Sequence, residues 1–382
     1  MLKKIIRPGE PGFQRCTVTI MDTTDPDITF DEAGVSSWVH FYREKVLPRW
    51  NPSGNPSAFA ALIRRIKEDG KGKEYDCALG LSGGVDSSYL AYIAKKEGLR
   101  PLVVHTDAGW NSDIAVKNIE KIIKATGFDL FTVVIDWDEI ADLQRAFLRA
   151  GVPNQDIPQD HVIFSAFYGL ADKHRIKWVL SGHNYACESV LPPAWGYTPT
   201  DVRHLKAIHR KYGEKPLGSF PLMSSVKYGL LYMLLRGMRK VNLLDPLPYV
   251  RTEAMQVLER EFGWQYYGGK HYESRWTRFF QGWWLPAKFG YDKRLAHLSS
   301  LILSGQMTRE AALQEIQTSA YTQSMMEEDR NLVLKKLGLT LEDWNAIMNG
   351  PLHAHDEYPT SEFLPKTLMS AYCLLRRTAL FR

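Results

Sequence analysis

The chain has 382 residues, which at roughly 150 residues per domain suggests two or three domains. Hydrophobic residues make up 45% of the chain and charged residues 24%, values typical of globular proteins that exclude a disordered or fibrous chain. The formal net charge of +5 is too small over this length for a nucleic-acid coat. The four cysteines are widely spaced and form no CxxC pair, which argues against a disulfide framework and fits a reducing compartment.

The sequence contains no segment of the kind that targets a protein to a membrane. The basic N-terminus lacks the apolar region of a secretory signal, and no stretch approaches the ~20 apolar residues that span a bilayer. We therefore expect a cytoplasmic protein without a membrane span.

The predicted elements alternate between strands and helices over the middle of the chain. Residues 1 to about 50 are irregular, and a helix near 57–67, with Ser57 as its N-cap, leads to a Gly/Lys linker at 69–73. Beyond it, short apolar runs predict strands at 76–81, 102–106, 131–135 and 177–181, and amphipathic stretches predict helices at 85–97, 112–126, 138–150 and 160–174.

This alternation predicts an α/β fold, a doubly wound parallel sheet with helices on both faces. After residue 245 only helices are predicted, at 252–262, 308–318 and 341–349, with a terminal amphipathic helix opening at Thr360. The predicted domains are an N-terminal module (1–73), a nucleotide-binding domain (74–245) and a helical C-terminal substrate or partner region (246–382). In such sheets ligands bind beyond the carboxyl ends of the strands.

The loop between the first strand and its helix carries the strongest signal for chemistry. It reads Ser82-Gly83-Gly84-Val85-Asp86-Ser87-Ser88. Two glycines allow the backbone to approach an anion, and the hydroxyls and helix N-terminal amides can donate to phosphate oxygens. A carboxylate such as Asp86 would repel a polyanion unless it holds Mg²⁺, so we expect Asp86 to be a Mg²⁺ ligand. The loop contains no lysine and therefore does not match a Walker loop.

The loop resembles the SGGxDS signature of the PP-loop ATP pyrophosphatases, the adenine nucleotide alpha hydrolase-like fold. The resemblance implies ATP and Mg²⁺ as cofactors, attack on the α-phosphate, and an adenylated intermediate with pyrophosphate held by residues 82–88. Asp86, His183 and Ser82 are the predicted catalytic residues. His105 and Asp107 after the second strand, with Gly182, His183 and Asn184 after the fourth, complete the predicted nucleotide site. His183 could instead be a capping or core histidine, and His105 could equally be structural. Asp107 and Asp136 could serve Mg²⁺ or merely begin turns.

Cysteine usage bears on which nucleophile would displace AMP. Thiolating relatives in this superfamily generally need reactive cysteines, and here only Cys187 is well placed, although it could be structural. Ammonia is the favoured nucleophile, and the sequence shows no glutaminase pattern that would produce it. The rival functions are a tRNA-modifying thiolase or ligase and a nucleotide-binding sensor without catalysis.

A closer resemblance, to the N-acetyl sugar amidotransferases of lipopolysaccharide and flagellar sugar biosynthesis, covers about residues 15 to 320. It rests on Asp22-Thr-Thr-Asp-Pro26, the two loops above, Gly268-Gly-Lys-His-Tyr-Glu-Ser-Arg275, Phe289 to Arg294 and Leu298 to Gly305. The resemblance implies conversion of an acetamido group on a nucleotide-activated sugar to an acetamidino group. It also implies a glutaminase subunit and an ammonia-channelling barrel subunit, similar to imidazole glycerol phosphate synthase, and no nucleic-acid partner.

The N-terminal module departs from that family, which commonly carries two cysteine pairs there. Cys16 is present, but Thr19 stands where its partner would fall, and Ser36 and Val39 replace the second pair. One thiolate cannot hold structural zinc, so we expect no zinc site.

The segment 270–294 mixes cations with aromatic residues. Arginines pair with phosphates and aromatic faces stack on bases, which would suit a nucleotide-sugar pocket. The predicted substrate-binding residues are Lys270, Glu273, Arg275 and Arg278. An RNA-binding face and a helical packing surface have the same composition.

Overall fold

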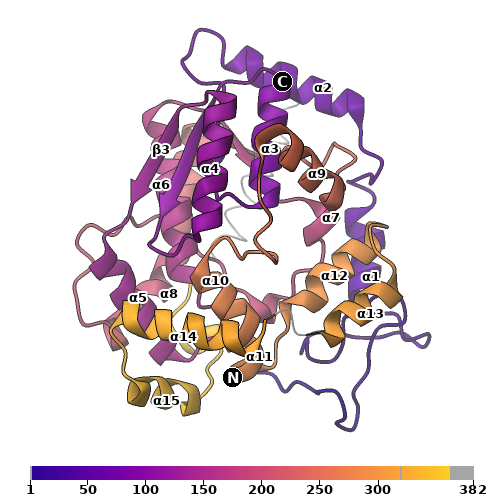
Figure 1. The fold of residues 1–382 in the computed structure, drawn as a ribbon, viewed down its shortest axis with the longest axis vertical. Helices are drawn as coiled ribbons and strands as arrows, with labels where there is room; N and C mark the ends of the chain where they lie inside the picture. The colour runs from indigo at the N-terminus through magenta and orange to yellow at the C-terminus, as the bar shows by residue number, and fades with distance from the viewer. Residues whose placement is uncertain (1, 319–320, 362–382) are drawn as a thin grey trace.

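The computed structural model describes residues 2–318 and 321–361 (Figure 1). Its centre is a five-stranded, fully parallel sheet of strand order β3-β2-β1-β4-β5. The strands are β1 (Cys77–Gly80), β2 (Pro101–Asp107), β3 (Leu130–Val134), β4 (Trp178–Ser181) and β5 (Arg239–Asn242). The chain thus has the α/β fold with a doubly wound parallel sheet that the sequence predicts.

Helices cover both faces of the sheet because successive strand residues point to opposite sides. Cys77 and Leu79 belong to the hydrophobic cluster that includes α3, α4 and α9, whereas Ala78 belongs to the cluster of α6 and η3. These helices are α3 (Val85–Lys96), α4 (Asp113–Thr126), α6 (Ile157–Lys173), η3 (Lys227–Leu235) and α9 (Arg251–Phe262). In Figure 1, α3 and α4 lie nearer the viewer than α6.

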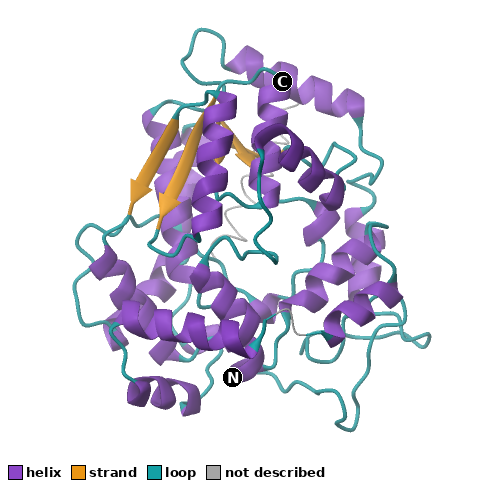
Figure 2. Ribbon diagram, viewed as in Figure 1, coloured by secondary structure: helices purple, strands orange, loops and turns teal. Residues whose placement is uncertain are grey.

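The remaining helices between residues 137 and 212, and those after residue 274, lie mostly beyond the carboxyl ends of the strands, as Figure 2 shows. Those within the first two thirds of the chain are α5 (Trp137–Ala150), α7 (Tyr185–Glu188), η2 (Pro193–Trp195) and α8 (Val202–Tyr212). The C-terminal ones are α10 (Arg275–Phe279), η4 (Phe280–Trp284), α11 (Leu285–Phe289), α12 (Lys293–Leu303), α13 (Arg309–Gln317), α14 (Gln323–Leu337), α15 (Leu341–Asn349) and η5 (His355–Glu357). The chain therefore places a helical region directly over the sheet edge where ligands are expected.

The N-terminal segment is irregular apart from α1 (Ser37–Phe41), η1 (Tyr42–Val46) and α2 (Pro56–Asp69). The Cys16 sulfur accepts hydrogen bonds from the backbone amides of Thr19 and Ser36, each at 3.3 Å, and Val39 is also fully buried. The positions of the family's cysteine pairs therefore gather around one buried thiol. Among the described residues, no group of three or more His, Cys, Asp or Glu side chains could hold a metal ion.

Two predictions about elements need correction. The N-cap of α2 is Asn55, whose carboxamide oxygen accepts from the Ala58 amide, while the Ser57 hydroxyl donates to that same oxygen. Strand β5 was not predicted, because its charged residues Arg239 and Lys240 interrupt the apolar run that identifies a strand. The terminal helix expected from Thr360 falls beyond the described residues. Within the described residues, no helix has the length and apolarity needed to cross a bilayer.

Candidate active site

The loop from Ser82 to Ser88 joins β1 to the N-terminus of α3 and folds back on itself. The Ser82 hydroxyl lies 3.1 Å from the Ser87 hydroxyl and accepts from the Gly84 amide at 3.2 Å. Gly83 has φ +81°, and a Cβ there would lie 2.5 Å from the Ala115 carbonyl oxygen. Only glycine fits this position, so the loop can approach α4 closely and wrap an anion at the start of α3.

Asp86 lies in the first turn of α3 and faces the next loops. Its Oδ1 accepts from the Tyr249 hydroxyl at 2.5 Å and from the Asn184 carboxamide at 3.3 Å. Within the described chain no hydrogen bond occupies Oδ2. A carboxylate held by one oxygen beside a phosphate-binding loop suits Mg²⁺, which takes few protein ligands and completes its shell with phosphate oxygens and water.

The segment after β4 packs directly against this loop. A Cβ at Gly182 would lie 3.3 Å from the backbone of Asp86 and Ser87, so a glycine allows the two loops to touch. His183 Nδ1 is hydrogen-bonded to one oxygen of Glu188, and Lys270 Nζ lies 2.8 Å from the other.

Burial opposes the charge of Glu188, but Lys270 and then His183 hold the pKa of Glu188 well below its usual range. Burial likewise opposes the charge of Lys270, whereas Glu188 and then Asp86 act to raise the Lys270 pKa, which lies above its ordinary value. The result is a lysine that stays protonated beside the phosphate loop. Such a cation can stabilise charge that develops on an α-phosphate.

A C-terminal segment, residues 264–275, crosses over the loop and closes the site. The Trp264 indole donates to the Gly83 carbonyl at 3.0 Å, and the Tyr267 hydroxyl accepts from the Val85 amide at 3.2 Å. The same segment pairs with the loop after β2, where the Ser112 amide donates to the Glu273 carbonyl at 2.8 Å. Lys270 and Glu273 are thereby brought to the phosphate loop although they lie far from it in sequence.

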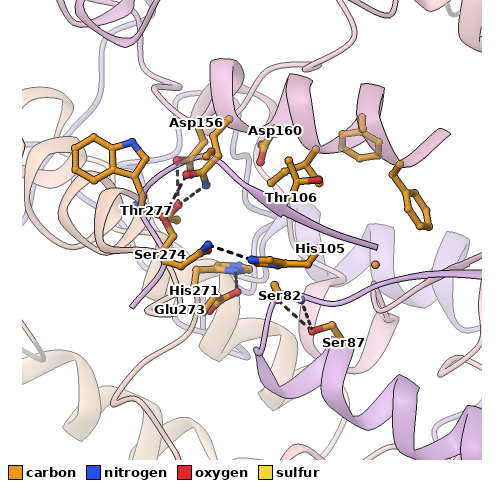
Figure 3. A pocket seen from close by; sticks show the side chains of 18 of the residues that line it. Ser82, Ser87, His105, Thr106, Asp156, Asp160, His271, Glu273, Ser274 and Thr277 are labelled. Carbon is orange, nitrogen blue, oxygen red and sulfur yellow. Dashed lines mark hydrogen bonds and ion pairs between the residues drawn. The ribbon is translucent and has the colours of Figure 1, made fainter. Parts of the chain in front are cut away.

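Three cavities meet at this point. A small one of about 190 Å³ contains the loop, Asp86, His183, Lys270 and Glu273. A second, of about 450 Å³, extends over the ends of β1 and β2 and is lined by His105, Asp156, Asp160 and Lys293 among others. Figure 3 shows this second cavity, with His271 and Glu273 beside Ser82 and His105.

The third cavity, of about 540 Å³, opens beside Lys270 on the side of α12. Cationic side chains contribute much of its polar lining, and tyrosines stand among them. These residues are Arg251, Lys270, Lys293, Arg294, Tyr266, Tyr272 and Tyr321. Lys270 thus borders both the phosphate loop and the cation-lined cavity.

The residues predicted after β2 have different roles in the structure. His105 Nδ1 donates to the Leu81 carbonyl at 2.9 Å and its Nε2 accepts from Asn111 at 3.1 Å, so the ring is fixed in the cavity wall. Asp107 accepts from the Gly109 amide and from Asn111, which is the role of a residue that begins a turn. Asp136 likewise caps α5 by accepting from the Glu139 amide.

Arg275 and Arg278 face away from these cavities. Both donate to the fully buried carboxylate of Asp329, Arg275 at 2.7 Å and Arg278 at 2.7 and 2.6 Å. Neither lines any of the three cavities. The ion pair and the position of the two arginines do not support their predicted contact with substrate.

The aromatic rings of this segment form a packing surface. Trp276, Phe279, Phe280, Trp284 and Phe289 are each at most 4% exposed and belong to the core of the C-terminal region. Rings buried in this way cannot stack on a base, so the packing alternative holds for them.

Sequence reasoning missed several residues that the fold brings to the site. They are Glu188, Tyr249, Arg251, Tyr267 and His297, and none stands in a motif of glycines and hydroxyls. Only Glu188 had a local signal, since it follows His183 by five residues across one short helix. The others reach the site through contacts distant in sequence.

The loop, its helix and the neighbouring strand ends have the arrangement expected of a PP-loop fold. Comparison with protein families agrees: residues 73–184 match the asparagine synthase family, and residues 273–372 match the C-terminal domain of LPS biosynthesis protein WbpG-like proteins. The chain is thus similar to both families, in each case over less than a third of its length. A search of curated proteins finds no match.

Solved structures with a similar arrangement include three proteins of low sequence identity. One is a predicted subunit of tRNA methyltransferase from Methanocaldococcus jannaschii (15% identity, 48% of this chain, 73% of that chain, TM-score 0.29). The second is NMN synthetase from Francisella tularensis (14% identity, 56% of this chain, 94% of that chain, TM-score 0.29). The third is NH3-dependent NAD synthetase from Campylobacter jejuni (13% identity, 55% of this chain, 93% of that chain, TM-score 0.28). Likeness at these values carries no statement about activity.

Proposed function

We propose that the protein is an ATP-dependent, AMP-forming amidotransferase that converts an acetamido group of a nucleotide-activated sugar to an acetamidino group. The observation that carries the proposal is the position of Lys270, which borders both the phosphate loop and a large cavity lined by cations. An ATP-utilising loop joined to a WbpG-like domain of lipopolysaccharide biosynthesis supports the same reaction class.

The loop and its neighbours suit the first step. The acetamido oxygen attacks the α-phosphorus, the bond from that phosphorus to the bridging oxygen breaks, and pyrophosphate leaves. Residues 82–88 hold the departing pyrophosphate, while Lys270 and His183 offset charge on the α-phosphate. Asp86 would hold Mg²⁺, which when bound neutralises phosphate charge.

The second step replaces oxygen by nitrogen. Ammonia attacks the carbon of the adenylated amide, the carbon–oxygen bond breaks, and AMP departs with the former amide oxygen. One proton leaves the attacking nitrogen, and the product is an amidinium. The chemistry requires no reductant or oxidant.

The cation-lined cavity is the acceptor site in this proposal. Arg251 and Lys293 supply positive charge that suits the diphosphate of a nucleotide sugar, and tyrosines beside them suit its sugar and base. Arg294 is paired with Asp292, which lines the same cavity together with Glu315. Of the substrate-binding residues predicted from sequence, Lys270 and Glu273 remain in the proposal.

The supply of ammonia stays a prediction. A glutaminase subunit and a barrel subunit that channels ammonia are proposed partners on the strength of the family resemblance. Reconstitution with and without these subunits, compared at matched free ammonium, would show whether glutamine can serve as the nitrogen source.

The thiolase alternative is disfavoured by the environment of Cys187. Burial, and then the charge of Asp86, raise the pKa of the Cys187 thiol to about 12. A thiol with so high a pKa is a poor nucleophile at neutral pH.

The test is isotope transfer with purified protein, ATP, Mg²⁺, ammonium and candidate UDP- or CMP-linked N-acetyl sugars. With ¹⁸O in the acetamido oxygen, AMP should acquire the label. In the unlabelled reaction the sugar should lose about 1 Da as oxygen becomes NH. Label in phosphate, or ADP as the nucleotide product, would refute activation at the α-phosphate.

A further inference from the structure

His297 on α12 is a partly buried histidine whose ring nitrogens have no hydrogen-bond partner among the described residues. Both ring nitrogens are inaccessible to solvent, and neither has a partner in the part of the chain that the structure describes. The side chain lines the cation-lined cavity and also an adjacent cavity of about 420 Å³ that reaches His271 and Glu188. Buried polar groups are nearly always paired, so an unpaired imidazole facing two cavities indicates a ligand contact.

Two other histidines of the chain, His161 and His105, show the contrast, although His204 also has one ring nitrogen unpaired within the described chain. His161 uses both ring nitrogens, bonding to the Pro199 carbonyl and the Met223 amide. His105 does the same with Leu81 and Asn111. These rings are structural parts of the core, whereas neither nitrogen of His297 is paired with another described residue.

The charges around His297 keep its ring neutral. Burial lowers the pKa of His297 well below its ordinary value, and the positive charges of Lys270, His271 and Lys293 lower it further, while Glu188 opposes them. A neutral imidazole can accept a proton, and phosphates bound nearby would add negative charge that raises its basicity.

His297 also lies beside a strained residue of the segment 264–275 that crosses over the phosphate loop. The ring centroids of His271 and His297 are 5.7 Å apart, and His271 has φ +64°. Non-glycine residues in the left-handed region are uncommon and cluster at functional sites. The pair therefore stands where the cavity beside the phosphate loop meets the cavity assigned to the acceptor.

We propose that His297 accepts the proton that ammonia loses as it attacks the adenylated amide. The proposal rests on the proposed function above. Nitrogen forms its bond to the amide carbon, His297 Nδ1 or Nε2 takes one proton from that nitrogen, and the electron pair of the breaking carbon–oxygen bond leaves with AMP. The imidazolium then passes the proton to a phosphate oxygen of the AMP that leaves.

The experiment separates the two half-reactions in His297→Gln. Acceptor-dependent exchange of labelled pyrophosphate into ATP reports adenylation alone, and it should stay within a few-fold of the unmodified enzyme. Turnover with ammonia should fall about 100-fold or more, the usual contribution of a general base. Hydroxylamine forms a more acidic nitrogen adduct than ammonia does, so turnover with hydroxylamine should fall much less.

Two further variants distinguish chemistry from packing. Imidazole added to His297→Ala should restore part of the ammonia reaction. Leu301→Ala opens the same cavity one helical turn away without removing a base, and the ratio of its rates with ammonia and hydroxylamine should match that of the unmodified enzyme. Thermal melts identify any His297 variant that fails to fold. The ratio of the rates with ammonia and hydroxylamine in the His297 variant that does fold then tests the role of His297.

Equal losses with ammonia and hydroxylamine, with no imidazole rescue, would overturn the role of His297. Loss of pyrophosphate exchange together with turnover would also overturn it, since His297 would then serve adenylation or binding. If the unmodified enzyme forms no AMP with any acceptor, the proposed function itself fails, which is a separate result.

Discussion

Replacing Lys270 by methionine tests the electrostatic centre of the site. Lys270 and Glu188 form an ion pair of 2.8 Å in which each side chain is only about 15% exposed (15% and 16%). Methionine preserves most of the volume of the lysine stem but removes the charge. Among the described residues, the Glu188 carboxylate then keeps only the hydrogen bond to His183.

Two effects of different size follow from that geometry. Removing one partner of a buried ion pair costs about 3 kcal/mol of folding free energy, because the remaining carboxylate is left without compensation. Loss of a cation at the α-phosphate should lower kcat by roughly 10²–10³, the effect of deleting one preorganised electrostatic group.

A double variant separates these effects. Lys270→Met with Glu188→Gln removes the uncompensated carboxylate, so the free energy of unfolding should recover while kcat should stay low. Stability is measured by urea denaturation, and kcat by release of AMP. The matched control is Lys288→Met, which removes a buried lysine that donates to the Ile347 and Gly350 carbonyls and should lower stability without the loss in kcat.

The reasoning is refuted if the double variant regains the activity of the unmodified enzyme. Lys270 would then serve only to neutralise Glu188, and the phosphate loop would have no need of its charge. Full activity in the single variant Lys270→Met would refute the reasoning equally.

Three further substitutions test other parts of the structure. Gly83→Ala combines φ +81° with a Cβ 2.5 Å from the Ala115 carbonyl oxygen. It should lower the free energy of unfolding by at least about 1–2 kcal/mol and weaken ATP binding in calorimetry at least tenfold. The control is Gly169→Ala in α6, where a Cβ would meet no atom within 4 Å and neither effect is expected. Burial, and then the charge of Asp156, raise the pKa of Asp160 to about 8 from 3.8. The unfolded chain releases this proton near pH 4 while the folded chain keeps it, so the free energy of unfolding should fall as pH rises from 4 to 8. An Asp160→Asn variant whose melting temperature changes with pH as steeply as that of the unmodified protein would contradict the assignment. Asp329→Asn should lower the free energy of unfolding by about 3–5 kcal/mol, because it removes the carboxylate that Arg275 and Arg278 share. The control is Glu328→Gln, at a side chain that is 65% exposed, which should change the melting temperature little. Equal changes of melting temperature in the two variants would disprove the buried ion-pair cluster.

Much of the fold was predictable because its signals are local. Apolar runs that end at turns mark β1 to β4, and Gly127 and Gly151 end α4 and α5 in the left-handed conformation as a C-terminal glycine predicts. Strand β5 escaped prediction because an edge strand needs only one neighbour and tolerates charged residues.

The site was predictable only where its residues stand in one loop. Glycines and hydroxyls at Ser82–Ser88 predict a phosphate-binding loop by composition and spacing alone, and the structure places this loop where β1 leads into α3. Arginines carry no such signature: Arg275 and Arg278 look identical in sequence to phosphate ligands, and only the fold reveals Asp329 between them. The unpartnered state of His297 is likewise a property of three-dimensional packing.

The crossing of residues 264–275 over the phosphate loop has a consequence for how the protein acquires activity. A fragment ending at residue 184 would contain the nucleotide motif but neither Tyr267 nor Lys270. Contacts between such remote segments form late, since closing long stretches of chain costs entropy before any contact repays it. Nucleotide affinity should therefore appear only as the last third of the polypeptide docks, which makes ATP binding a reporter of complete refolding.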